Sequence, residues 1–72
     1  MDYKKYISID SKVRFGKPCI KGTRISVYDV LNWLSIGQST EEILLDFPEL
    51  SKMQILSCLA YAASKEGATR VA

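Results

Sequence analysis

The chain has 72 residues, 47% of them hydrophobic, and a formal net charge of only +2. A domain of this length buries about 60% of the surface that its unfolded chain exposes, so its own core is small and help from a partner is expected. Only two cysteines, no histidine and no CxxC spacing argue against a structural zinc site. We find no signal peptide and no stretch of membrane-spanning length, and we expect a cytoplasmic protein.

The charges are divided unevenly along the chain. Residues 1–26 hold seven of the ten Lys/Arg and two of the eight Asp/Glu, whereas the remainder holds three and six. The first third is therefore +5 and the rest −3. Such a division predicts a basic surface that faces an anionic partner, of which nucleic acid is the commonest. For Lys4, Lys5 and Lys12, a role in merely solubilising a loop is an equally good interpretation.

Before residue 26 the pattern favours strands and turns. Apolar and polar residues alternate at 7–9 and again at 13–15, which predicts two short half-buried strands. The glycines and the proline between 16 and 22 exclude a helix there. We interpret Cys19 and Cys58 as small apolar residues rather than as a disulfide.

Three capping boxes predict the starts of three helices, because in each a serine is followed three residues later by an acid or an amide. The pairs are Ser26 with Asp29, Ser39 with Glu42, and Ser51 with Gln54. The helices are expected over 27–36, 40–46 and 52–66, ending at Gly37, before Pro48 and at Gly67 respectively.

Each predicted helix has an apolar stripe that is expected to face the core. The stripes are Val27, Val30, Leu31 and Leu34 in the first helix, Ile43, Leu44 and Phe47 in the second, and Ile55, Leu56, Leu59, Ala62 and Ala63 in the third. The fold class is therefore mainly α, as one domain over 1–72. It divides into a basic β/turn segment (1–25), a three-helix bundle (26–67) and a tail (68–72).

The second and third helices have the layout of a helix-turn-helix, a short helix joined to a longer one by a tight connection. The outward face of the third helix is expected to carry Lys52, Gln54 and Ser57. In that arrangement Gln54 reads adenine and Lys52 meets phosphate or guanine, although one lysine is few cations for such a helix. An equally good interpretation is that Gln54 is only the capping amide and that this face packs on another subunit.

A stronger basic element lies ahead of the helices. Arg14, Lys17, Lys21 and Arg24 fall within eleven residues, on a backbone stiffened by Pro18. We predict that these cations contact DNA phosphates, because a preordered turn loses little entropy on binding. Arg24 has a competing role, in which it bonds to backbone carbonyls and holds the loop against the first helix. Whether this segment or the third helix binds DNA stays open.

No enzymatic machinery is visible. With no histidine, nucleophile elbow or phosphate-binding loop, we expect a protein that is not an enzyme and has no cofactor. The carboxylates of Glu41, Glu42, Asp46 and Glu49 are interpreted as solvated residues that complement helix dipoles, not as a metal site.

A homodimer is predicted from apolar side chains that the core does not use. Trp33 flanks the stripe of the first helix and Ile36 lies nearly opposite it, while Met53 and Ala60 mark a side of the third helix. Trp33 is a good interface anchor, although packing against the N-terminal strands is an equally ordinary role. A small chain with leftover apolar surface favours self-association.

Residues 16–63 carry a series of motifs: G-x-P-x-I-x-G-T-R, a helix, G-x-S-x-E-E-I, F/Y-P-x-L, and a closing helix that ends in Y-A. In these motifs the chain resembles the small bacterial domain-of-unknown-function family 433. The first motif maps onto Gly16, Pro18, Ile20, Gly22, Thr23 and Arg24.

The resemblance implies a homeodomain-like three-helix domain with a short β segment in front. It also implies an antitoxin of a type II toxin–antitoxin system, dimeric, that neutralises a PIN-like ribonuclease toxin and binds operator DNA. A stand-alone helix-turn-helix transcriptional regulator and a dimerisation or adaptor module are the alternatives.

A PIN-like nuclease gathers carboxylates around divalent metal, and these carboxylates attract a cation when the metal is absent. A guanidinium suits such a site because it stays charged and engages two oxygens. We therefore predict that Arg70, in the tail, approaches the toxin's active site. A frayed terminus without a partner is the competing interpretation.

Overall fold

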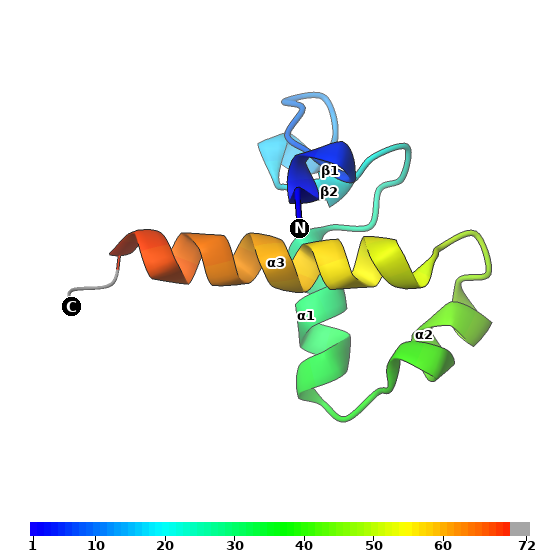
Figure 1. Ribbon diagram of the computed structural model, residues 1–72. Helices are drawn as coiled ribbons and strands as arrows, with labels where there is room; N and C mark the ends of the chain where they lie inside the picture. Colours follow the sequence, from blue (N-terminus) through cyan, green and yellow to red (C-terminus); the bar gives the residue numbers. More distant parts are fainter. Residues whose placement is uncertain (70–72) are drawn as a thin grey trace.

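The structure, a computed structural model, describes the backbone of residues 1–69 and the side chains of residues 1–65. It has three α-helices, α1 (Val27–Ser35), α2 (Thr40–Asp46) and α3 (Lys52–Thr69). Two strands, β1 (Ile7–Ser8) and β2 (Cys19–Ile20), and two 3-10 turns, η1 (Tyr3–Lys5) and η2 (Arg14–Gly16), precede them. In Figure 1, α3 crosses α1, with the N-terminal segment on one side of α3 and α2 on the other. A mainly helical fold with a short β segment is thus confirmed.

All three capping boxes form, which explains where the helices begin. At α1, the Asp29 N–H donates to Ser26 Oγ (2.9 Å) and the Ser26 N–H donates to Asp29 Oδ2 (3.0 Å). Ser39 with Glu42 and Ser51 with Gln54 make the same reciprocal pairs. The reciprocal bonds satisfy N–H groups that the first turn of a helix leaves unpaired.

The end of α1 is also encoded locally. Gly37 has a positive φ of +98°, and the Gln38 N–H donates to the Trp33 carbonyl at 3.0 Å. A second bond, from the Gly37 N–H to the Leu34 carbonyl (3.1 Å), completes a Schellman motif. The expected boundaries of α1 and α2 are confirmed to within one residue.

The β segment is only partly as predicted. β1 pairs antiparallel with β2, so that Ile7 lies opposite Ile20. The second strand expected at 13–15 is wrong, because Arg14 and Phe15 adopt left-handed backbone conformations (φ +50° and +60°) in η2. The chain reverses between β1 and β2, and the real partner strand lies further on than expected, within the stretch that composition marks as turns.

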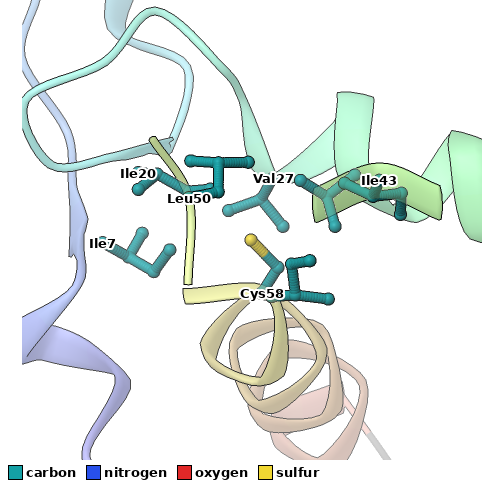
Figure 2. Packing of buried hydrophobic residues seen from close by; sticks show 8 residues of the cluster. Ile7, Ile20, Val27, Ile43, Leu50 and Cys58 are labelled. Carbon is teal, nitrogen blue, oxygen red and sulfur yellow. The ribbon is translucent and has the colours of Figure 1, made fainter. Parts of the chain in front are cut away.

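Eight buried apolar side chains form the core, and the N-terminal segment contributes two of them. They are Ile7, Ile20, Val27, Val30, Ile43, Leu50, Ile55 and Cys58. Figure 2 shows the Cys58 thiol directed from α3 into this cluster. Both cysteines are free and buried, as expected, and burial raises the pKa of the Cys58 thiol to about 11.

The inward face of α3 differs from the prediction. Ile55 is buried, but Leu56 and Leu59 are 38% and 43% exposed, and Cys58 and Ser57 are buried in their place. The side of α3 that is buried is the one that α1, α2 and the N-terminal segment cover together. The expected stop at Gly67 is also wrong, since α3 continues to Thr69 and a glycine permits a helix end without imposing one. Within the described residues, no helix combines the length and apolarity needed to span a bilayer.

Candidate nucleic-acid interface

Arg14 braces the N-terminal segment against α1. Its Nη1 donates to the Arg24 carbonyl oxygen at 2.7 Å and to Asp29 Oδ2 at 3.0 Å. Asp29 is the acid of the α1 capping box, so one guanidinium connects η2, the loop before α1 and the helix start. Arg14, and not Arg24, therefore holds the loop against α1. The Arg14 guanidinium, which was predicted to contact phosphate, already bonds to Asp29 and to the Arg24 carbonyl. Among the side chains of residues 1–65 this is the one ion pair.

The electrostatics of Asp29 strengthen this brace. Partial burial by itself raises the Asp29 pKa, but the hydrogen bonds with the Ser26 backbone, the Arg14 guanidinium and the Ser26 hydroxyl together hold it below its ordinary value. The carboxyl is therefore ionised at neutral pH. Arg14 and the first turn of α1 share it as a common acceptor.

The other three predicted cations, Lys17, Lys21 and Arg24, are exposed. The loop that carries two of them is fixed by Thr23, whose Oγ1 donates to the Ile20 carbonyl (2.9 Å) and accepts from the Ile25 N–H (3.0 Å). A rigid loop presents Lys21 and Arg24 in set positions, so little conformational entropy is lost when an anion binds.

Two of the three predicted contact residues on α3 have local structural partners instead. The Gln54 Oε1 accepts from the Ser51 N–H at 2.7 Å, which is the capping role that competed with base reading. Ser57 is fully buried and its hydroxyl donates to the Gln54 carbonyl (2.6 Å), so the prediction that it contacts DNA is wrong. Lys52 is exposed, but its neighbours on the surface of α3 are Met53 and Leu56.

The four predicted interface residues are spread over the molecule. Trp33 is half-buried and stacks on Phe47, with ring centroids 4.8 Å apart and planes 15° apart, so one face of the ring packs within the chain and its role in a dimer stays a prediction. Ile36 is 73% exposed but follows α1 at the end that lies away from α3 (Figure 1). Met53 and half-buried Ala60 lie on α3 itself.

Two further predictions are placed as follows. Glu42 caps α2, and Asp46 accepts a hydrogen bond from Gln38 Nε2 at 2.9 Å, so both carboxylates have local structural partners. Arg70 lies outside the described residues.

Sequence reasoning missed an apolar groove of about 660 Å³ between α1 and α3. Its walls come from three separate segments and include Tyr28, Leu31 and Tyr61. Lys17 and Lys65 also line the groove, and the Lys65 ammonium lies 5.2 Å from the centre of the Tyr61 ring. Because residues distant in sequence form the groove, no local pattern indicates it.

Sequence reasoning also missed a protruding aromatic side chain. Phe15, expected to be the inward residue of a strand, is 99% exposed at the tip of η2. The glycine that follows it was the available signal, because glycine often marks a turn with positive φ.

The chain matches a protein family and is similar to a bacterial protein. Residues 7–62 match the family described as "Protein of unknown function (DUF433)". Uncharacterized protein y4eO of Sinorhizobium fredii (strain NBRC 101917 / NGR234) is 38% identical over an alignment of 58 residues, and the match covers 78% of this chain but only 26% of that protein.

A solved structure is also similar. The crystal structure of a DUF433 member protein from Anabaena variabilis ATCC 29413 matches with a TM-score of 0.80 at 24% identity, over 85% of this chain and 60% of that chain. At this identity the likeness concerns the fold.

Proposed function

This chain belongs to the DUF433 family of proteins of unknown function, and from its surfaces we propose that it is an antitoxin-type protein that acts by binding alone. Its basic N-terminal loops bind operator DNA, and its apolar helical surfaces bind a PIN-like ribonuclease toxin. In this proposal α2 and α3 form a homeodomain-like helix-turn-helix that serves mainly as a scaffold.

One observation carries the DNA-binding part of the proposal. Lys21 and Arg24 are exposed on a hydrogen-bonded loop, Lys17 is exposed at the end of η2, and none of the three is ion-paired to a described side chain. Cations held in this way suit the phosphates of a duplex, whose contacts fix a protein's position and supply most non-specific affinity.

The surface of α3 supports the assignment of DNA to the loops. A base-reading helix presents polar and cationic groups to the major groove, whereas exposed Leu56 and Leu59 have no polar atom to offer a base edge. Exposed apolar surface is better suited to a protein partner. The groove between α1 and α3 provides a second apolar site for the same partner, with Lys65 as the lining cation that is not assigned to DNA.

The DNA-binding part is tested by changing Lys17 and Lys21 together to glutamine. We expect the double variant to bind its own promoter and an unrelated duplex more weakly by the same factor, because phosphate contacts carry no sequence information. The slope of log affinity against log salt should fall by about two. Fluorescence anisotropy at several salt concentrations measures both quantities.

Lys4 and Lys5, changed together to glutamine, provide the matched control, since η1 loses the same charge from residues that are not among the predicted DNA contacts. If the Lys17/Lys21 variant binds as the wild type does, the basic loop is only a structural brace.

The toxin-binding part is tested by co-expression with a PIN-like protein from the adjacent open reading frame. We expect the wild type to restore growth and to co-purify with the toxin, and Arg70→Ala to weaken both effects. Full rescue by Arg70→Ala removes that residue from the proposal. A chain that neutralises the toxin but never binds DNA is an adaptor, which is the alternative that the exposed leucines favour.

A further inference from the structure

Phe15 occupies a position that disfavours it in the isolated fold. Its φ of +60° lies in the left-handed region, between Arg14 at +50° and Gly16 at +81°. A residue with a Cβ is strained there, and glycine avoids this strain. The ring is also 99% exposed, so it gains nothing from burial. Neither the backbone nor the core explains a phenylalanine at this position.

The turn that carries Phe15 is nevertheless well fixed. Bonds from the Gly16 N–H to the Val13 carbonyl (3.1 Å) and from the Lys17 N–H to the Arg14 carbonyl (3.2 Å) close it on both sides of the ring. Arg14 is held in turn by Asp29 and by the Arg24 carbonyl. The ring therefore projects from an ordered turn, and little entropy is lost when it enters a partner.

The surroundings of Phe15 indicate what it enters. Lys12 and Lys17, both exposed, lie within three residues on either side of it. An exposed apolar ring with one exposed cation before it and another after it in the chain suits a nucleic acid, in which stacked bases lie between two lines of phosphates. A purely apolar pocket in a protein accommodates the ring but leaves the two lysines without counter-charges.

We propose that Phe15 inserts its ring between adjacent base pairs of the duplex that the basic loops bind, which unstacks that step and bends the DNA. The inference rests on the proposed DNA binding and adds to it a contact with the bases, which lysine–phosphate contacts lack. Pyrimidine–purine steps such as TA unstack most easily. The protein therefore prefers duplexes that place such a step beneath Phe15.

The test uses the full chain and promoter duplexes that carry 2-aminopurine, a base whose fluorescence rises when it is unstacked. We expect the wild type to raise the fluorescence at one step, and Phe15→Ala to lose that signal together with about tenfold in affinity. Phe15→Trp should keep both. Leu45→Ala shortens an exposed apolar side chain elsewhere in the molecule, on α2, and should behave as the wild type.

The same measurements separate this inference from the proposed function. If the wild type binds no duplex, both are overturned. If it binds and Phe15→Ala keeps the affinity and the fluorescence signal, only the insertion of Phe15 between base pairs is overturned. If Phe15→Ala weakens the binding of single-stranded DNA but not of the duplex, insertion between base pairs is also overturned, because the ring then stacks on unpaired bases.

A stability measurement checks the premise that Phe15 is not there for the fold. Phe15→Gly and Phe15→Ala both remove the ring, but only glycine relieves the left-handed backbone. We expect Phe15→Gly to melt at a higher temperature than Phe15→Ala while it binds duplex DNA equally weakly. A lower melting temperature for the glycine variant contradicts the strained turn and overturns the inference.

Discussion

The N-terminal segment and α3 differ from what their compositions suggest about which apolar side chains are buried. The segment is basic and rich in turns, yet it places Ile7, Cys19 and Ile20 in the interior. The apolar helix α3 leaves Leu56 and Leu59 on the surface instead. How apolar a segment is does not decide how much of it is buried, because burial depends on which of its faces meets the rest of the chain.

The sharpest test of this contrast compares Ile20→Ala with Leu59→Ala. Ile20 is fully buried, so its truncation leaves a cavity and should lower the free energy of unfolding by about 2–4 kcal/mol. Leu59 is 43% exposed, and its truncation should lower the free energy by less than about 1 kcal/mol. Urea unfolding of both variants measures the difference. Equal losses contradict the observed placement of α3.

A smaller effect distinguishes the two arginines of the N-terminal segment. Arg14→Ala removes the two hydrogen bonds to Asp29 and to the Arg24 carbonyl, and should reduce the stability by about 1–2 kcal/mol. Arg24→Ala removes the same charge from an exposed side chain and should change the stability by no more than about 0.5 kcal/mol. If Arg24→Ala is the more damaging of the two in urea unfolding, Arg14 is not the brace.

The smallest effect is a dependence on pH. Because the pKa of Asp29 is lowered in the folded state, its contribution to stability is complete above the ordinary value of 3.8 and is lost as the pH falls toward the lowered value. Asp29→Asn should therefore lose less stability than the wild type between pH 5 and pH 2. Urea unfolding across that range measures this slope, with Glu49→Gln as the carboxyl-to-amide control. An unchanged slope in Asp29→Asn contradicts the role of this carboxylate.

The candidate site was predictable in part. Lys17, Lys21 and Arg24 are exposed, as phosphate-binding residues must be, because charged side chains rarely leave the surface unpaired. Arg14 was misassigned because its partner, Asp29, lies fifteen residues away and only the folded chain brings them together. Phe15 was misassigned because alternation was taken as a strand, while the left-handed turn at Arg14 and Phe15 put the ring in solvent.

The sequence by itself determined what depends on neighbours three to six residues apart. It specified the three helix starts through their capping boxes, the end of α1 at Gly37, and α2 between Ser39 and Phe47. Hydrogen bonds within one or two turns decide these features, so they follow from local residue types.

Only the tertiary structure decided which face of α3 is buried. The apolar stripe of the helix is broad, with Leu56 and Leu59 beside Ile55 and Cys58, so its pattern allows more than one orientation. The packing of α1, α2 and the N-terminal segment on α3 buries Ile55, Ser57 and Cys58 instead of the two leucines. The pairing of β1 with β2 and the Arg14 brace depend in the same way on contacts between distant residues.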